Sequence, residues 1–429
     1  MRNIKEKRGI TLIALAVTIV IILILAGVTI DAVFSENGII NKAKEAANRM
    51  NNLVKEDETE LNELLNELNE TMDTNWNSNI EIPEENTVPE PDPEPEAPKI
   101  EDVTEIQEET IQVEDEYGNK VTIPKGFEVV EEEGTTVPEG IVVQDAIGNQ
   151  FVWIPVGRVY KDNTGTNYSD IQLGRYTFNR SNGTPTLVQA AYTEENPQNY
   201  KQLVTLNDNS YGYQEYSTRT NPDGIASDGT DGLNAIAKNL GAFVDSVKNN
   251  GGYYLGRYES SYGSGSSIED YKPFSKISTG YDLNKMNYIK GTLWVQVTQI
   301  DAAKISRNMY NNDDTVGVES DLVNSYAYDT AIVFIQERGN KNYANKVSIN
   351  SSIANTGTTG DKVCNIYDIA SNCSEWSTEY SNSKSSGSAY PCVNRGGIFY
   401  GNPTSSSSRM NFSAKGMSPY SFRILLYNL

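Results

Sequence analysis

The apolar residues of the chain fall into three successive patterns. Residues 10–30 are 21 consecutive residues without a charge, which as a helix would cross about 30 Å of hydrocarbon. An apolar stripe at three- and four-residue steps then predicts an amphipathic helical extension over residues 31–78. Its apolar positions are Leu53, Leu61, Leu64, Leu65, Leu68 and Met72. From residue 145 onward, short β-rich runs alternate with polar loops, so we expect a separate C-terminal domain.

A few regular elements stand out in the C-terminal half. Asp115–Asn119 and Asp145–Asn149 form a weak repeat, in which Gly-Asn lies between β-rich runs as in hairpin turns. Helices are predicted over residues 233–247, ending at Gly251, over 299–309, capped by Thr298, and over 328–336, with Asp329 as candidate cap. Strands are predicted over residues 150–154, 253–258 and 293–297. The pattern predicts an α+β domain with much irregular loop structure over residues 145–429, preceded by a small β unit over 112–144.

Charge is concentrated between the membrane segment and the C-terminal domain. Residues 45–145 hold 30 Asp and Glu against 5 Lys and Arg, whereas residues 146–429 hold 25 against 24. Within the acidic part, residues 79–111 begin with a Pro- and Glu-rich run, which favours an extended, semi-rigid linker. No basic face is visible, so we expect no nucleic-acid partner.

Composition also limits the chemistry. The chain has no histidine, which excludes Ser-His-Asp and Cys-His nucleophiles, histidine-ligated metals and an imidazole base. Its cysteines are Cys364, Cys373 and Cys392, without a Cys-x-x-Cys pair. Outside the cell one disulfide is expected, and we favour Cys373 with Cys392, although sequence does not fix the connectivity.

The start of the chain resembles the leader of type IV prepilins. Residues 1–9 carry four basic residues and end in Gly9, directly before the apolar run. These charges predict a cytoplasmic N-terminus and an extracellular C-terminal domain on a single-pass cell-membrane protein. The resemblance implies that prepilin peptidase cuts between Gly9 and Ile10 and that the helix over 10–30 packs with pilin subunits. Ala14 stands where the family usually has Glu, so a plain uncut anchor is the alternative to incorporation into a surface pilus.

Ordered segments of the C-terminal domain resemble the sulfatase-modifying factor domain. They are Gly256–Glu259, Asn365–Trp376, Arg395–Gly397 and Phe422–Arg423. The resemblance covers residues 145–429 and implies the fold of the formylglycine-generating enzymes, a variant of the C-type lectin fold.

Several residues in and around these segments also carry expectations of their own. Gly396 and Gly397 permit close backbone approach or positive φ. Glu375 is expected to pair with Arg395 or Arg423. The core is expected to contain Trp153, Trp294 and Trp376.

The resemblance further bears on metals and catalysis. In the family, the segment matching Asn372–Glu375 supplies oxygen ligands to calcium, so Asn372 and Glu375 are candidate calcium ligands. The alternative is a metal-free loop in which Asn372 caps a turn and Glu375 pairs with an arginine. The copper-binding cysteine pair and the iron-binding histidines of the known redox members are missing, so neither copper nor iron is expected and we expect no catalysis.

A Tyr-, Ser- and Asn-rich segment near the C-terminus is the candidate ligand face. This composition is typical of adaptable recognition loops, and lectin-like relatives use the same region. The candidate residues are Phe399, Tyr400, Asn402, Ser407, Arg409, Asn411 and Tyr420. The alternative is a soluble loop with the aromatic residues packed beneath it.

Three functional hypotheses follow. The first is an adhesion or recognition protein at the membrane or in a pilus, with a non-catalytic lectin-like domain that binds an extracellular glycan or protein. The second is a divergent formylglycine-generating oxidoreductase with relocated metal ligands such as Cys373 and Cys392. The third is a minor structural pilin.

Overall fold

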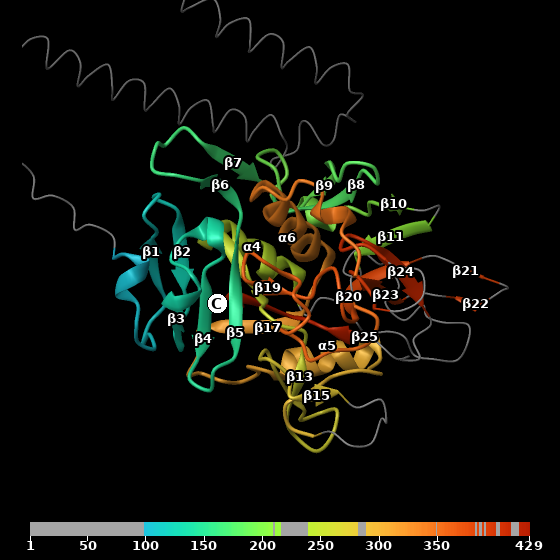
Figure 1. Ribbon diagram of the computed structural model, residues 1–429. Coiled ribbons are helices and arrows are strands. Elements are labelled where there is room, and N and C mark those ends of the chain that lie inside the picture. Colours follow the sequence, from blue (N-terminus) through green and yellow to red (C-terminus); the bar gives the residue numbers. More distant parts are fainter. Residues whose placement is uncertain are drawn as a thin grey trace, which may run out of the picture. The chain divides into compact units, whose positions relative to one another are not determined.

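The computed structural model describes residues 98–208, 211–215, 239–281, 289–348, 350–381, 384–385, 388–389, 392–399, 404–412 and 420–429. They belong to one compact unit, Glu94–Leu429 (Figure 1). The predicted cleavage site at Gly9 and Ile10, the apolar segment 10–30 and the extension 31–78 lie outside the described residues. Within the part that is described, no helix is both long and apolar enough to cross a membrane.

Six antiparallel strands form the first large sheet, in the order β17-β26-β12-β5-β4-β3. The strands β5, β12 and β26 are almost entirely buried, which explains their nearly continuous apolar sequences. Because β3 pairs with β4 and β4 pairs with β5, the sheet begins before residue 145 and continues across it, and the structure has no boundary there between a small β unit and the main domain. The bounds are β3 Phe127–Val129, β4 Val142–Asp145, β5 Gln150–Pro155, β12 Gly252–Gly256, β17 Val318–Leu322 and β26 Ile424–Asn428.

The second large sheet is organised around β20. Strand β23 pairs along one edge of β20, while β11 and the parallel strand β25 share the other edge. The outer strands are β10, beside β11, and β24, beside β23. The bounds are β10 Leu206–Asp208, β11 Tyr211–Glu215, β20 Ser374–Ser381, β23 Cys392–Arg395, β24 Arg409–Phe412 and β25 Tyr420–Phe422.

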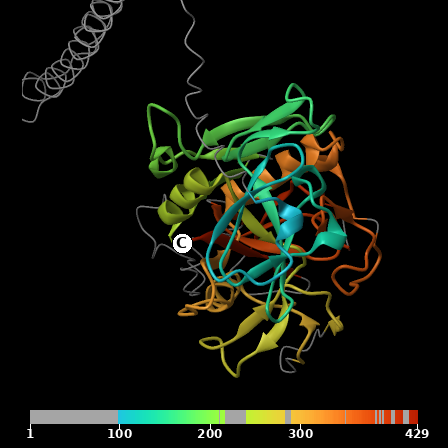
Figure 2. The same cartoon turned by 90° about the vertical axis from the view of Figure 1, so that its left-hand side faces the viewer.

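Smaller sheets flank these two. In Figures 1 and 2 the hairpins β6–β7 and β8–β9 lie at one end of the molecule, and the four-stranded sheet β13–β16 lies at the opposite end. The hairpins are β1 Ile111–Glu114 with β2 Lys120–Ile123, β6 Gly157–Tyr160 with β7 Tyr168–Ile171, β8 Gly174–Phe178 with β9 Pro185–Ala190, β18 Lys362–Val363 with β19 Ile366–Tyr367, and β21 Lys384–Ser385 with β22 Ser388–Ala389. The four-stranded sheet contains β13 Ser261–Ser264, β14 Lys272–Phe274, β15 Gly280–Tyr281 and β16 Thr292–Leu293.

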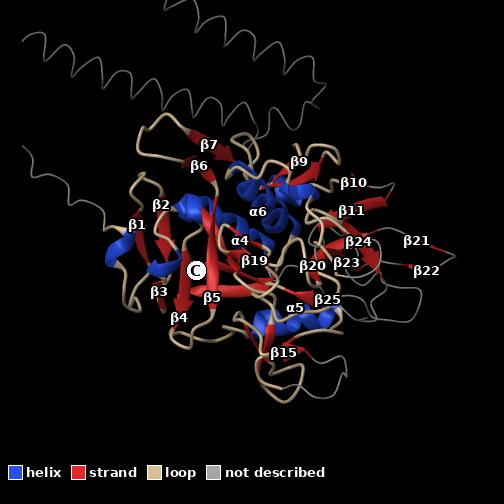
Figure 3. Ribbon diagram, viewed as in Figure 1, coloured by secondary structure: helices blue, strands red, loops and turns tan. Residues whose placement is uncertain are grey.

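Strands outnumber helices among the described residues (Figure 3). Helix α4 packs on β12 and β26, α5 packs on β17, and α6 contacts both β5 and β20. Residues 325–336 of α6 are all buried, so this helix lies in the core between the large sheets. The α-helices are α4 Leu240–Asn250, α5 Gln299–Asn308 and α6 Ser325–Glu337, and short 3-10 helices span Ile100–Asp102, Glu131–Glu133, Val137–Glu139, Asn199–Lys201 and Tyr343–Asn345.

The helix signals of the sequence are largely confirmed. Helix α4 ends at Gly251 in a left-handed conformation with φ 76°, and Thr298 caps α5 by accepting the Asp301 N–H at 3.1 Å. Asp329 as the cap of the third helix is wrong, because α6 begins one turn earlier and is capped by Asn324. Asp329 lies inside the helix and is fully buried.

The predicted Gly-Asn repeat is confirmed as two matching hairpin turns. In both turns the Asp side chain accepts the N–H of an Asn four residues later at 2.8 Å, and the intervening Gly has positive φ. The Asn side chain then binds a distant backbone: Asn119 pairs with Tyr160, and Asn149 accepts the Ser275 N–H at 3.1 Å. Each Asn side chain therefore connects a distant segment of the chain to its hairpin.

Candidate functional site

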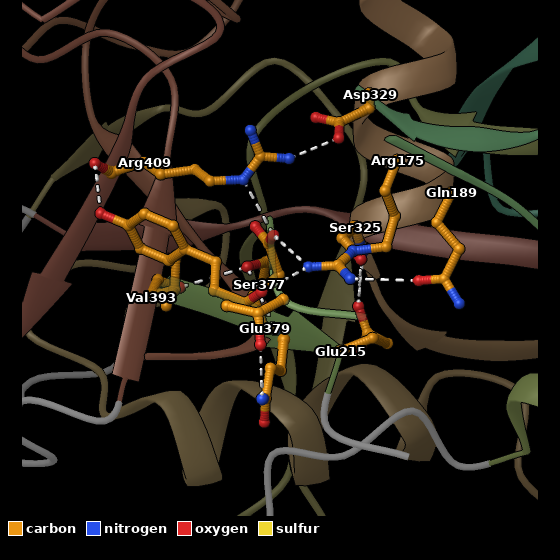
Figure 4. Close-up of polar contacts among 12 residues, drawn as sticks. Arg175, Gln189, Glu215, Ser325, Asp329, Ser377, Glu379, Val393 and Arg409 are labelled. Atoms are coloured by element: carbon orange, nitrogen blue, oxygen red, sulfur yellow. Dashed lines mark hydrogen bonds and ion pairs between the residues drawn. The ribbon is translucent and has the colours of Figure 1, made fainter. Parts of the chain in front are cut away.

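Five charged side chains from five elements form a buried charge network. They are Arg175 on β8, Asp329 on α6, Glu379 on β20, Arg395 on β23 and Arg409 on β24. Figure 4 shows Arg175, Asp329, Glu379 and Arg409 of this network. None is more than 4% exposed. Sequence analysis singled out Arg395 and Arg409 but did not connect them.

Each carboxylate of the network joins two or more guanidinium groups. Glu379 accepts from Arg395 Nη1 at 2.8 Å and from Arg409 Nε at 2.9 Å, with Arg175 Nη2 at 3.9 Å. Asp329 accepts from Arg395 Nη2 at 2.5 Å and also from Arg409 Nη2. Burial alone would raise the pKa of Glu379, but the charges of Arg409, Arg395 and Arg175 outweigh it and lower the pKa to about 2. Glu379 is therefore ionised at neutral pH and tightly paired with these arginines.

The network also binds backbone groups and so fixes the strands that carry it. Arg409 Nη1 donates to the Tyr176 carbonyl at 3.2 Å, which ties β24 to β8. Arg175 donates to the carbonyl oxygens of Val204 and Tyr213, both at 2.9 Å. Since breaking a buried ion pair leaves an uncompensated charge, these strands are held firmly together.

A second buried ion pair confirms one expectation. Glu375 pairs with Arg423, with Arg423 Nη2 at 2.5 Å and Nε at 3.0 Å from Glu375 Oε1. Glu375 also lies opposite Arg395 in the β20–β23 register, although the Arg395 side chain binds Glu379 and Asp329. Burial raises the pKa of Glu375 more than Arg423 lowers it.

The candidate calcium ligands already have partners within the protein. The Asn372 Oδ1 accepts the Ala354 N–H at 2.9 Å, and its Nδ2 donates to Glu259 at 2.5 Å. Both oxygens of Glu375 accept from Arg423. As arranged, these side chains do not fit a calcium ion, and the described residues contain no group of three or more Cys, Asp or Glu placed to hold a metal. Elemental analysis of the purified protein tests the calcium prediction directly.

The predicted disulfide is not formed in the structure. No disulfide joins Cys373, Cys392 or Cys364. Cys373 packs in a small apolar cluster with Leu293, whereas Cys392 belongs to the main core. Burial raises the pKa of Cys373 well above its usual range and that of Cys364 to about 12, so neither is poised as a thiolate.

The packing expectations for Gly and Trp hold. Gly396 has φ 84°, and a Cβ added to Gly397 would lie 2.0 Å from the Ala370 carbonyl oxygen. The three tryptophans expected in the core, Trp153, Trp294 and Trp376, are at most 3% exposed.

The candidate ligand face is only partly a surface. Arg409 and Tyr420 are 4% and 3% exposed, which corrects their assignment to an exposed face. Arg409 belongs to the buried charge network, and the Tyr420 ring packs 5.2 Å from Trp376 between centroids. Phe399, Ser407 and Asn411 are half-buried, and Tyr400 and Asn402 lie outside the described residues.

A polar pocket of about 330 Å³ opens next to the network. We call it the serine pocket. One wall is the segment Thr404–Met410, which leads into β24, and the other comes from the end of β8 and from β10. Its lining residues are Phe178, Arg180, Asp208, Asn345, Val347, Thr404, Ser405, Ser407, Ser408, Arg409 and Met410.

Sequence analysis missed half of this pocket. Arg180, with its side chain 65% exposed, pairs with Asp208 at 3.0 Å across the β8–β10 side. The region 160–230 gave no recognisable chemistry, and no spacing in the sequence relates Arg180 to the serines more than 220 positions later. Only the fold brings them together.

Comparisons of the chain with protein-family models, with curated proteins and with solved structures find no match.

Proposed function

We propose that the unit Glu94–Leu429 is a non-catalytic recognition domain, carried at the cell surface by a membrane- or pilus-associated N-terminal segment. The observation that carries this proposal is the serine pocket. One wall of the pocket belongs to the C-terminal segment for which the resemblance to the sulfatase-modifying factor and C-type lectin fold implies a ligand face. The pocket is concave and polar, and it rests on strands that the buried charge network fixes.

The serine pocket combines strands that the charge network holds in place with accessible residues at its rim, and this combination supports a binding role. Arg409 and Glu379 hold the strands from inside the domain. Ser407 and Arg180 lie on the rim, where substitutions change the surface without touching the network. Recognition sites commonly place variable loop residues on such a rigid scaffold.

The state of the thiols favours binding over the oxidoreductase alternative. Copper or iron held by Cys373 and Cys392 would need converging thiolates, whereas these thiols lie in different apolar clusters. The side chains of the charge network are buried and paired with one another, which leaves them unsuited to acid–base chemistry on a substrate.

The test is binding of the purified full-length chain to arrays of extracellular glycans and proteins. We expect saturable binding that is lost in Ser407→Trp, which fills the pocket, and retained in Asn163→Trp, which adds the same ring at an exposed position on the β6–β7 loop. Binding that survives Ser407→Trp, or a lack of any saturable binding, would contradict the proposal. Copper- or iron-dependent oxidation of cysteine peptides would favour the enzyme instead.

A further inference from the structure

The hydrogen-bonding groups of the serine pocket indicate which chemistry it accepts. We infer that the pocket binds a neutral, hydroxyl-rich ligand of the saccharide class, and that Arg180 is its specificity-determining donor. This inference rests on the proposed function and goes beyond it by naming the ligand class.

The serine wall has few donors left for a ligand. The backbone N–H groups of Ser405, Ser406, Ser407 and Ser408 all donate within the protein. The Ser407 hydroxyl donates to the Ala344 carbonyl at 2.8 Å and the Thr404 hydroxyl to the Gly396 carbonyl at 3.0 Å. One hydroxyl proton of the Ser405–Ser408 pair is used in their mutual contact at 3.1 Å. These hydroxyl oxygens therefore face a ligand mainly as acceptors.

Asn345, which also lines the pocket, likewise offers a ligand an acceptor rather than donors. Its Nδ2 donates to the Asn179 carbonyl at 2.9 Å and to Asn342 Oδ1 at 2.7 Å, which uses both amide protons. Its Oδ1 remains as an acceptor. The ligand must supply most of the protons in its hydrogen bonds with this wall.

Arg180, on the other wall of the pocket, offers a ligand hydrogen-bond donors. Its Nη2 donates to Asp208, and the rest of its fork of N–H groups stays available to a ligand oxygen. The guanidinium and the Asp208 carboxylate together carry no net charge. The deeper Arg409 is likewise paired, with Glu379 and Asp329.

These features disfavour ligands that can only accept hydrogen bonds and ligands that can only donate them. A carboxylate, sulfate or phosphate offers acceptors only, and it would place them against the oxygens of Ser407 and Asn345. An ammonium offers donors only, so it would leave the available N–H groups of Arg180 without an acceptor. A neutral polyol both donates and accepts, and its apolar C–H faces can lie on Phe178, Val347 and Met410. About 330 Å³ is at the small end of ligand pockets, which suits a short saccharide.

The experiment uses the full-length chain in a detergent without a sugar headgroup, because an alkyl glycoside would itself be a probe. Arrays carry neutral hexoses and N-acetylhexosamines, uronic acids, sulfated sugars, amino sugars and a panel of extracellular proteins. Calorimetry then measures the best neutral saccharide against wild type, Arg180→Ala and the matched control Arg158→Ala. Arg158, with its side chain 51% exposed, also pairs with an aspartate, Asp170, at 3.1 Å, and lies outside the pocket.

We expect neutral saccharides to bind, with about a tenfold or greater loss of affinity in Arg180→Ala and no change in Arg158→Ala. Deoxyfluoro saccharides, which keep an acceptor but lose the donated proton, should bind as weakly as the deoxy sugars. Thermal melting of each variant checks that the fold is intact.

The other outcomes overturn the inference in distinguishable ways. Pocket-dependent binding of acidic or amino sugars alone, or of a protein alone, would refute the ligand class and leave the recognition function standing. Tight binding of deoxyfluoro sugars would refute the inference that the ligand donates its hydroxyl protons to the serine wall. Absence of binding to every probe would count against the proposed function itself.

Discussion

Replacing Asp329 with Asn tests whether the buried charge network holds the domain together. The carboxylate accepts from Arg395 at 2.5 Å, from Arg409, and from the Tyr176 N–H at 2.8 Å, and it is fully buried. The substitution leaves three buried guanidinium groups facing Glu379 alone, and Asn adds an N–H₂ donor against them. Removing one partner of a buried ion pair costs about 3–5 kcal/mol, so we expect the free energy of unfolding to fall by about that amount.

Urea unfolding of the full-length chain, followed by tryptophan fluorescence, measures this change. Trp153, Trp294 and Trp376 are buried and report on the core. The control is Asp170→Asn, which removes an ion pair whose side chains are 51% and 62% exposed and should cost less than about 1 kcal/mol. If Asp329→Asn costs no more than this control, the network does not carry the strand connections that we assign to it.

Four further predictions concern other parts of the chain. The pKa of Glu379 in the folded protein, about 2, lies below its ordinary value of 4.5, so its contribution to stability is complete above the ordinary value and is lost as the pH falls toward 2. Glu379→Gln should therefore remove this contribution to the fall in the free energy of unfolding that urea denaturation measures at acid pH. Gly397→Ala should lower the melting temperature through a loss of about 1–3 kcal/mol, whereas Gly280→Ala, whose Cβ would meet only Thr292 at 3.9 Å, should change it little. Thiol titration after unfolding without reductant should count three cysteines; a count of one would restore the predicted disulfide. Mass spectrometry of the membrane-extracted protein should find an N-terminus at Ile10 if prepilin peptidase cuts the leader, and an intact leader if the segment is a plain anchor.

Local chemistry explains which structural expectations the structure confirms. The Gly-Asn turns, the Gly251 helix end and the Thr298 cap depend on residues within a few positions of one another, and φ preference and side-chain capping act at that range. The Glu375–Arg423 pair was also anticipated, although the sequence left Arg395 as an equal partner. A buried charge must find an opposite charge, but the sequence does not say which one is nearest.

The errors arise where tertiary packing overrides local appearance. Asp329 is a residue type that often caps helices, but in the structure it lies in the core, where it pairs with Arg395 and Arg409. Tyr420 lies in a segment whose composition is typical of recognition loops, yet it belongs to a strand that pairs with β20, and its ring packs against that of Trp376. Composition describes a segment as a whole, whereas burial is decided residue by residue by the neighbouring strands.

By itself, the sequence determined the division into an apolar leader region, an acidic linker and a nearly neutral C-terminal part, together with the absence of histidine chemistry. These properties are sums and periodicities along the chain, so they do not depend on the fold. Only the tertiary structure decided that five charges from β8, α6, β20, β23 and β24 meet in one network, and that Arg180 and Ser407 line the same pocket. These residues lie on separate elements, as Asp329 does at 66 and 80 positions from Arg395 and Arg409. Strand pairing and core packing, not sequence spacing, bring them together.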